Sequence, residues 1–364
     1  MKNKIASIII LLILFSVFFS GCLDVLFNYG TTTYESHPTK INYKISYGYL
    51  IDCSGANDLE NYQINYDCDL PEVLNGQIVA TTIHDENYTE KTLATYNDVI
   101  SWAIQDNLNK QYDLGITVFI TSQSYVIADL NGADALSVQE IATQNPDLIS
   151  QYCQAQSNET TAFIDPNNLD ISQNASLIYI QAETDNAFIL ARELFRWLKQ
   201  NTDYQTHTNA DYVQPAGTTI SCKTGDCDDL SYLYISLCKS LGIPARFIRG
   251  FLIDENTAIP HAWAEVFIGG GIGNSGWIPV ECAGTSSNAE TEIHQNFGVE
   301  SADHLRLFID DGTNESIIVS LSSLTYIIYG DVNIRTTSYA DVSDYEVTQS
   351  NELVIDENNQ RSYS

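Results

Sequence analysis

Basic residues are scarce in this chain. Only 16 of its 364 residues are Lys or Arg, against 47 Asp or Glu, so the formal net charge is −31 at pH 7. Charged residues make up only 17% of the chain, below the roughly 25% of typical soluble domains, so the chain is acidic because bases are missing. A protein that binds DNA or RNA needs clustered Lys and Arg to displace counterions from phosphates. We therefore exclude nucleic acid as a partner.

Internal repeats and low-complexity blocks are also absent from the sequence. Hydrophobic residues make up 44% of it, and it contains 22 Tyr, 13 Phe and 4 Trp. Disordered chains are poor in such residues, so most of this chain is expected to fold. Its length is enough for about two domains with a targeting segment and tails.

The first residues predict export to the cell surface. Lys2 and Lys4 precede an apolar or small-residue run over residues 5–19, which is typical of a signal peptide. The following Phe19-Ser20-Gly21-Cys22 resembles the lipobox of prokaryotic lipoproteins. We predict a signal peptide over residues 1–21, a lipid on Cys22 and a polar spacer over residues 22–40. The alternative is an uncleaved anchor helix, and both interpretations tether the protein to the extracytoplasmic face of the cell membrane.

Two further features concern that oxidising location. Glycosylation sequons (Asn-x-Ser/Thr) predict a glycoprotein; they begin at Asn87, Asn158, Asn174 and Asn314. Seven cysteines remain besides Cys22, and an odd number leaves at least one thiol free. Cys53 and Cys68 bracket a polar segment and are candidates for a short disulfide loop.

The pattern over residues 41–175 predicts an α+β domain without a catalytic motif. Residues 41–49 and 116–127 alternate, or run β-branched and aromatic, as strands do, whereas residues 95–108 place apolar side chains at helical spacing. After the following domain, residues 313–350 are expected to add C-terminal strands. The acidic, amide-rich residues 351–364 are expected to form a solvated tail.

The pattern is sharper over residues 176–312. An amphipathic helix is predicted over residues 185–200, and a leucine-striped helix runs from Leu230 to Leu241 and stops at Gly242-Ile243-Pro244. Strands are predicted after it, at residues 245–253, 262–268 and 276–280. We expect helices packed on an antiparallel sheet.

A candidate nucleophile stands where the leucine-striped helix begins. The sulfur of Cys227 would lie at the helix N-terminus, where the helix dipole and free N–H groups favour the thiolate. The adjacent carboxylates of Asp226, Asp228 and Asp229 oppose this by raising the thiol pKa, although they suit the first turn of a helix. A cationic partner is therefore needed.

The next hairpin offers that partner. If Ile268 and Gly276 face each other at its turn, Glu281 lies opposite Trp263, and His261 lies one pleat further along the same face. A carboxylate that orients an imidazole, which in turn faces a cysteine, is the arrangement of a cysteine acyl-transfer enzyme.

Four sequence blocks resemble the transglutaminase-like superfamily in the same order. The blocks are Gly225-Asp226-Cys227-Asp228-Asp229-Leu230, Leu241-Gly242-Ile243-Pro244-Ala245-Arg246, His261-Ala262-Trp263-Ala264-Glu265-Val266 and Gly276-Trp277-Ile278-Pro279-Val280-Glu281. The resemblance implies a papain-like α+β core with Cys227 as nucleophile, His261 as general base and acid, and Glu281 as the carboxylate that orients His261. The superfamily usually has Asp at that third position, and Glu is one methylene longer.

This superfamily contains transglutaminases, amide-bond hydrolases including peptidases, and inactive members that bind peptides. We expect an enzyme that cleaves peptide or carboxamide bonds of cell-surface peptides or proteins through a thioester, because water outnumbers any amine there. The alternatives are a non-catalytic module that binds peptides or surface partners, and a Cys227 that is half of a disulfide. The remaining histidines (His37, His84, His207, His294 and His304) lack zinc-ligand spacing, and the acids around Cys227 lack the spaced oxygens of a Ca²⁺ site. No metal or cofactor is expected.

Two more cysteines flank the predicted catalytic residues. Cys222 precedes Cys227 by five residues and Cys282 follows Glu281, so assembly of the site would bring them into one neighbourhood. We predict a Cys222–Cys282 disulfide, and a buried thiol at Cys238 on the apolar stripe of its helix.

Overall fold

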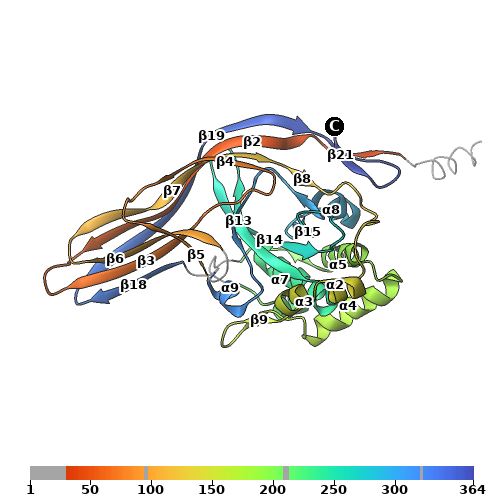
Figure 1. Cartoon of the computed structure of the whole chain (residues 1–364), viewed down its shortest axis with the longest axis horizontal. Helices are drawn as coiled ribbons and strands as arrows, with labels where there is room; N and C mark the ends of the chain where they lie inside the picture. The colour runs from red at the N-terminus through yellow and green to blue at the C-terminus, as the bar shows by residue number, and fades with distance from the viewer. Residues whose placement is uncertain (1–29, 94–96, 208–212, 320–322) are drawn as a thin grey trace, which may run out of the picture.

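The computed structural model describes residues 30–93, 97–207, 213–319 and 323–364. It is an α+β protein with mostly antiparallel sheets, as predicted: a long strand-rich body lies beside a helical part built on a separate sheet (Figure 1). None of the helices within the described ranges is long and apolar enough to cross a membrane. The predicted signal peptide and the lipidation site at Cys22 lie outside the described residues.

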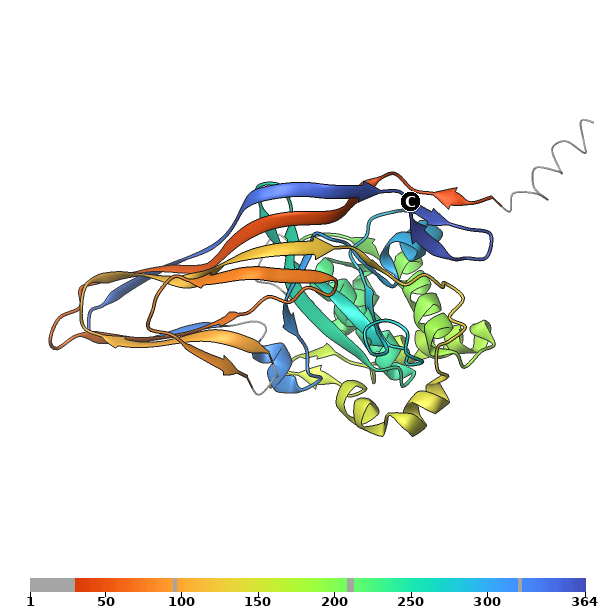
Figure 2. The same cartoon turned by 45° about the horizontal axis from the view of Figure 1, so that its top comes forward.

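Two four-stranded sheets form the strand-rich body, in the orders β18-β3-β6-β5 and β19-β2-β7-β4. Side chains on their inner faces alternate with outer ones; Ile41, Tyr43 and Ile45 of β2 and Tyr62 and Ile64 of β3 are completely buried. The two sheets extend together as a long arm away from the helices (Figure 2). Their strands are β2 (His37–Ser54), β3 (Asn61–Asp69), β4 (Gly76–Ile83), β5 (Thr89–Thr92), β6 (Asp98–Asp106), β7 (Lys110–Gln123), β18 (Leu324–Tyr329) and β19 (Asn333–Asn351).

The helix predicted over residues 95–108 is wrong. Residues 98–106 form β6, which pairs with β3 so that Trp102 lies opposite Tyr66 with stacked rings. Trp102 is completely buried between the sheets. β-branched and aromatic residues in this segment favour a strand once a partner is present, and this pairing overrides the helical spacing.

The chain's C-terminal part completes the N-terminal sheets. β18 pairs with β3 and β19 pairs with β2, so the predicted C-terminal strands belong to the same body as residues 37–123. The solvated tail predicted over residues 351–364 is wrong: β20 (Leu353–Ile355) and β21 (Arg361–Tyr363) form a small sheet with β1 (Thr32–Thr33). The described end of the predicted spacer is therefore paired strand too.

A four-stranded antiparallel sheet in the order β15-β14-β13-β17 carries the helical part. One hydrophobic core joins this sheet and its helices, and it begins at Ile127, so the residues between 127 and 175 pack here and not with the N-terminal strands. The sheet consists of β13 (Ala245–Ile253), β14 (Ala258–Phe267), β15 (Trp277–Val280) and β17 (His304–Ile309). The helices are α2 (Val138–Gln144), α3 (Pro146–Tyr152), α4 (Leu169–Ala182), α5 (Ala187–Asn201), α6 (Ala216–Cys222), α7 (Cys227–Ser240), α8 (Ala289–Asn296) and α9 (Asn314–Val319).

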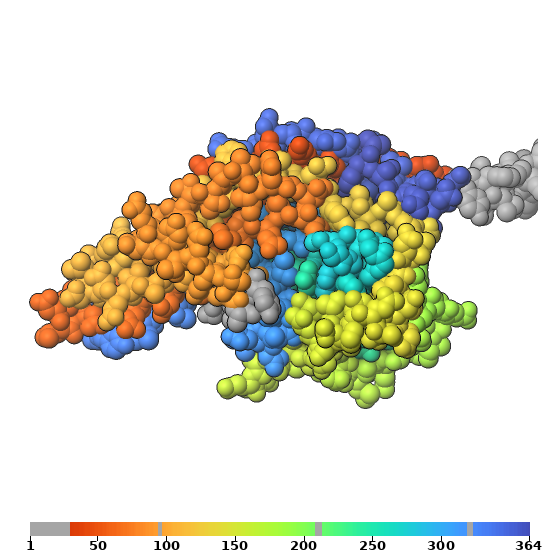
Figure 3. All heavy atoms as spheres, viewed as in Figure 1, coloured from red at the N-terminus to blue at the C-terminus, as the bar shows by residue number. Residues whose placement is uncertain are grey.

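The two helices predicted for this part are confirmed. α5 buries its apolar stripe completely, and α7 ends before Gly242, whose φ of 77° is suited to glycine after a helix. The glycine-rich loop after β14 lies against the segment before α2, where Leu136 N–H donates to Ile268 O at 3.0 Å (Figure 3). The remaining short strands are β8 (Tyr125–Val126), β9 (Gln156–Ser157), β10 (Ala162–Ile164), β11 (Asp203–Tyr204), β12 (Thr224–Gly225) and β16 (Val299–Glu300).

Candidate active site

Cys227 is the first residue of α7, as predicted. Asp226 caps the helix, and its N–H donates to Asp229 Oδ2 at 3.1 Å in a capping box. The buried Asp229 carboxylate also accepts hydrogen bonds from His207 Nε2 at 2.6 Å and from Gln214 N–H at 2.7 Å. The start of α7 is thus held from three sides, which fixes the position of Cys227.

The environment of Cys227 favours the thiol. Burial raises the pKa of Cys227 to about 12, with further contributions from Asp228 and Asp226, against a hydrogen bond from the Ala262 N–H that lowers it. Burial and a hydrogen bond to Asp226 also raise the pKa of Asp228, to about 9. Burial and the adjacent acids therefore oppose the helix N-terminus, so a thiolate at Cys227 needs the cationic partner that the sequence analysis called for.

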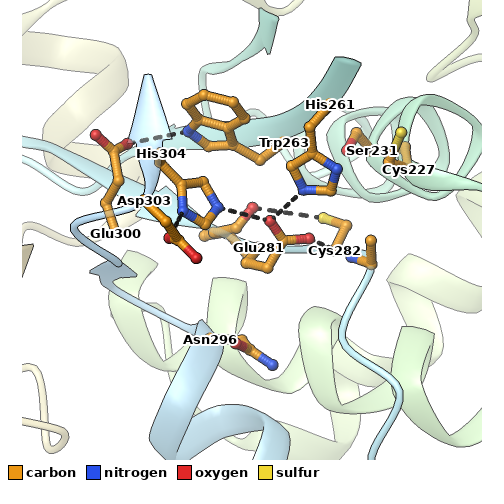
Figure 4. Close-up of polar contacts among 12 residues, drawn as sticks. Cys227, Ser231, His261, Trp263, Glu281, Cys282, Asn296, Glu300, Asp303 and His304 are labelled. Carbon is orange, nitrogen blue, oxygen red and sulfur yellow. Dashed lines mark hydrogen bonds and ion pairs between the residues drawn. The ribbon is translucent and has the colours of Figure 1, made fainter. Parts of the chain in front are cut away.

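The predicted hairpin register is confirmed. Ala264 pairs with Val280 and Phe267 with Trp277, the register that places His261, Trp263 and Glu281 on one face. His261 Nε2 donates to Glu281 Oε2 at 2.7 Å. Figure 4 shows His261 between Cys227 on one side and Glu281 on the other. Because Nε2 is taken by the carboxylate, Nδ1 is the nitrogen of His261 left for a proton transfer.

Glu281 accepts hydrogen bonds from three donors. Besides His261, His304 Nε2 donates to the same Oε2 atom at 3.0 Å, and Ala283 N–H donates to Oε1 at 2.6 Å. Burial alone would raise the pKa of Glu281, but His261 and His304 outweigh it and hold this pKa below its usual range. Glu281 is therefore a carboxylate at any pH at which the protein would work.

His304 is a member of this cluster that sequence reasoning missed. It begins β17, is 8% exposed, and its second ring nitrogen, Nδ1, lies 2.9 Å from Asp303 Oδ1. Burial would lower the pKa of His304, but hydrogen bonds to Asp303 and Glu281 raise it to about 10. No local spacing marks this residue, because β17 reaches the site only by pairing with β13.

A buried charge network holds the strands of the site together. Arg306 lies between Glu265 and Glu300, with contacts of 2.7 Å and 2.5 Å, and all three side chains are less than 5% exposed. Trp263 Nε1 donates to Glu300 Oε2 at 3.0 Å. The network joins β14, β16 and β17, so it ties the strand of His261 to the strand of His304 across the intervening β13.

The loop after Glu281 is fixed from the helical side. Lys199 of α5 donates to the carbonyls of Cys282 and Gly284 at 2.6 and 2.7 Å and forms a buried ion pair with Glu292 of α8 at 3.2 Å. Glu281 N–H donates to Asn296 O at 3.0 Å, again at the end of α8. The position of the carboxylate thus depends on two helices as well as on the hairpin.

Both predicted disulfides are absent from the structure. Cys222 is exposed, and its thiol donates to Thr224 O at 3.2 Å, whereas Cys282 is completely buried in the core. Cys53 and Cys68 are both free and buried. Cys53 is the second-last residue of β2, and Cys68 is the second-last residue of β3. Cys238 is a buried thiol, as expected. Cys227 is free, so the alternative that it is half of a disulfide is wrong within the described chain.

Tyr204 is a second side chain beside the nucleophile. Its strand β11 runs parallel to β12, with Tyr204 opposite Gly225, two residues before Cys227. Burial raises the pKa of Tyr204 to about 12, with further contributions from Cys227, Asp226 and Glu281. Its phenol therefore keeps its proton and can act as a hydrogen-bond donor near the site.

A cavity of about 730 Å³ opens at the Asp303 end of the cluster. Its wall combines apolar side chains, among them Leu252 and Ile259, with the carboxylates of Glu35, Asp254 and Asp303. Ile259 lies on β14 two residues before His261 and is half exposed.

Within the described residues, three groups of side chains have possible metal ligands close together: His261, Glu281 and His304; His207, Asp226 and Asp229; and Asp226, Cys227 and Asp228. In the first two groups the donors and acceptors already pair with each other. In the third, Asp226 and Asp228 share a hydrogen bond. Each group is explained by hydrogen bonding within the protein.

Comparison with known proteins agrees with this geometry. Residues 178–282 match the family model of the transglutaminase-like superfamily, a stretch that includes Cys227, His261 and Glu281. This part of the chain is a transglutaminase-like domain. A protein from Cytophaga hutchinsonii named "Putative Cysteine Protease" has a similar structure, with a TM-score of 0.51 and 15% identity over 92% of this chain and 100% of that one. At that identity the likeness shows a shared fold.

A curated relative is similar over a shorter stretch. The "Uncharacterized protein ML0607" of Mycobacterium leprae (strain TN) is 28% identical over 83 residues. These cover 21% of this chain and 29% of that protein, so the chain spans less than a third of the relative's length. The transglutaminase-like domain has a cysteine-enzyme fold.

Proposed function

We propose that this protein is a cysteine acyl-transfer enzyme that hydrolyses peptide or carboxamide bonds through a thioester on Cys227. The observation that carries the proposal is the row Cys227, His261 and Glu281, in which a helix-terminal thiol lies beside an imidazole that is itself held by a carboxylate at 2.7 Å. This is the nucleophile, base and orienting group that acyl transfer requires.

The reaction follows from these roles. His261 Nδ1 takes the proton of the Cys227 thiol as its sulfur attacks the substrate carbonyl, and the imidazolium then gives that proton to the leaving amine. The C–N bond breaks and a thioester remains on Cys227. Water, deprotonated by His261, attacks the thioester, releases the acid and restores the thiol. Glu281 stabilises the imidazolium that forms in each step.

The surroundings support a peptide substrate from the cell surface. The cavity beside Asp303, whose wall includes Ile259 two residues before His261, supports a substrate that extends beyond the reacting bond. The N-terminal pattern of an apolar run and Cys22 supports a lipid-anchored or helix-anchored protein on the extracytoplasmic face of the membrane. The four sequons remain predicted glycosylation sites.

The test is acylation by p-nitrophenyl acetate, with burst release of p-nitrophenolate followed by absorbance and the acetyl group located by peptide mass spectrometry. We expect one acetyl group on Cys227, no burst in Cys227→Ala or His261→Ala, and an unchanged burst in Cys222→Ala, which removes an exposed thiol outside the cluster. A full burst in His261→Ala would refute the proposal. Peptide amides offered with and without glycine methylamide then distinguish hydrolysis from transamidation by product mass.

A second candidate is a non-catalytic module that binds peptides. The observation that favours it is the raised pKa of the Cys227 thiol, about 12. The same acylation experiment separates the two functions, since a binding module forms no acetyl-Cys227.

A further inference from the structure

The cavity at the Asp303 end of the cluster has an acidic wall. Glu35, Asp254 and Asp303 contribute carboxylates, and no Lys or Arg of the described chain lines this cavity. Asp303 pairs with His304, whereas Glu35 and Asp254 form no ion pair within the described residues. Glu35 and Asp254 are exposed, and 46% of the Asp303 side chain is exposed. A molecule from solution can therefore reach all three carboxylates.

The rest of the wall is largely apolar and comes from both bodies of the molecule. Ile41 belongs to the strand-rich body, whereas Leu252 and Ile259 belong to the sheet that carries His261. Ligand sites are often cavities between two bodies, with mostly apolar walls and a few charged groups. The aliphatic stem of a Lys or Arg side chain packs well against such a wall, while its charged end can pair with the carboxylates.

Two phenols beside the acidic wall report on its charge. Tyr43 lies two residues after Ile41 on the same face of β2, is completely buried, and its hydroxyl makes no hydrogen bond to the described residues. Burial and the charge of Asp303 raise the pKa of this phenol. Burial and the charges of Asp303 and Asp254 likewise raise the pKa of Tyr345, which lines the cavity. A negative potential therefore extends through this wall, and a polar group there still lacks a partner.

The cavity is close enough to the catalytic row for one substrate to occupy both. Ile259 and His261 lie on the same face of β14, about 7 Å apart along the strand. Figure 4 shows Asp303 and Cys227 at opposite ends of the cluster. Three successive contacts of 2.9, 3.0 and 2.7 Å lead from Asp303 across the cluster to His261. An extended peptide at Cys227 therefore needs about three or four residues, at about 3.4 Å each, to reach Asp303.

We propose that this cavity is a subsite for a cationic side chain of the substrate, a Lys or Arg about three residues from the bond that Cys227 attacks. This inference rests on the proposed function, because it names the class of peptide that the same site receives. The subsite contributes recognition alone: Glu35, Asp254 and Asp303 attract the cation, and the chemical step at Cys227 is unchanged. Peptides with a neutral or acidic side chain at that position bind more weakly.

The experiment measures peptide binding to the full chain carrying Cys227→Ala, which forms no thioester, so binding is read without turnover. The probes are a fluorescein-labelled peptide of four Ala-Lys repeats and the same peptide with every lysine ε-acetylated, which removes the charges. The repeat places a lysine near the cavity in whichever register the peptide binds. Fluorescence anisotropy at physiological ionic strength gives both dissociation constants. We expect the lysine peptide to bind about tenfold more tightly than the acetylated peptide.

A charge-neutralising variant tests whether the cavity binds the lysine peptide. Glu35→Gln/Asp254→Asn removes two carboxylates from the wall, and it should weaken binding of the lysine peptide about fivefold. The matched control Asp58→Asn/Glu90→Gln removes two exposed carboxylates outside the cavity wall and gives the same net charge. This control should change the dissociation constant by less than about twofold.

A charge-adding variant tests the same point independently. Ile259→Lys introduces an ammonium group into the cavity wall, at a side chain that is 53% exposed, and should weaken binding of the lysine peptide about tenfold. The matched control Ile327→Lys adds the same charge on β18, at a side chain that is 50% exposed and outside the cavity. We expect this control to bind the lysine peptide as the parent protein does.

Equal binding of the two peptides would overturn the inference. Equal losses of affinity in the cavity variants and their controls would also overturn it, because the net charge of the chain would then explain the binding. The p-nitrophenyl acetate burst involves no peptide side chain, so Glu35→Gln/Asp254→Asn should leave it unchanged in the protein that retains Cys227. Absence of the burst, with selective binding of the lysine peptide retained, would refute the proposed function alone.

Discussion

Replacing Glu281 by Asp is the most informative single change at this site. It introduces the residue that the superfamily resemblance led us to expect, and it keeps the charge while shortening the side chain by one methylene. In the structure the carboxylate meets His261, His304 and the Ala283 N–H at 2.7, 3.0 and 2.6 Å. These three hydrogen bonds therefore depend on the length of the Glu281 side chain as well as on its charge.

The size of the effect follows from these distances. Withdrawing the carboxylate by one C–C bond, about 1.5 Å, stretches contacts near 2.8 Å to about 4 Å, beyond hydrogen-bond range. Hydrogen bonds to charged groups are worth about 1.5–3 kcal/mol each, and the chain around residue 281 can recover one of them by a small shift. We expect the free energy of unfolding to fall by about 2–4 kcal/mol and acylation of Cys227 to slow by about 100-fold.

The assay is the p-nitrophenyl acetate burst together with urea unfolding, for the wild type, Glu281→Asp, Glu281→Gln and a matched control, Glu140→Asp. Glu281→Gln keeps the length but not the charge, so it separates the two contributions and should also acylate slowly. Glu140 lies in an exposed capping box of α2, outside the cluster, so its shortening should leave acylation unchanged and lower the free energy of unfolding much less than Glu281→Asp does. Acylation by Glu281→Asp within about threefold of wild type, less than 1 kcal/mol, would refute the argument from reach.

Three further outcomes are expected. Arg306→Met leaves Glu300 buried without its charged partner and should lower the free energy of unfolding by about 3–5 kcal/mol in urea titration, and an unchanged midpoint would contradict the role of this network. Arg361→Ala removes a buried guanidinium that donates to the carbonyls of Ile127 and Phe297, so thermal unfolding should occur at lower temperature, whereas a freely solvated tail would show no change. The pKa of His304 is raised to about 10, so its contribution to stability is complete below about pH 6.5 and is lost as the pH rises through about 10. The difference in free energy of unfolding between wild type and His304→Gln should therefore shrink over that pH window. A difference that stays constant would contradict the raised pKa.

Local patterns were sufficient for the parts of the site that lie close together in the chain. Period-two alternation and a single glycine-rich turn set the register of β14 against β15, and this alone placed Glu281 beside His261. The leucine stripe and its Gly242 stop located α7, and hence the position of Cys227 at its start. Each of these inferences depends on a stretch of only about twenty residues, the range over which backbone periodicity is readable.

Segments that depend on distant partners were mispredicted. In β6, Ile100 and Ile104 fit both the helical and the strand period, and only the pairing with β3 decides between them. The C-terminal residues have the composition of a polar tail, but β20 pairs with Thr32 and Thr33. These two residues lie more than 300 positions before β20 in the chain, so no local pattern reveals the pairing. The raised pKa of the Cys227 thiol has a related cause, since the burial of Cys227 depends on how β14 packs over α7, which no local pattern reveals.

The unusual residue at position 281 and the unassigned histidine at position 304 explain each other. An Asp at 281 would place its carboxylate about 1.5 Å nearer its own backbone, close enough to serve one imidazole but not two. The extra methylene of Glu281 brings one oxygen within 2.7 Å of His261 and 3.0 Å of His304, so it has a use only if the second ring is present. His304 in turn is buried and charged, which is stable only with carboxylates on both nitrogens. The two departures from expectation are therefore one feature of this site, and a substitution at either position should change the behaviour of the other.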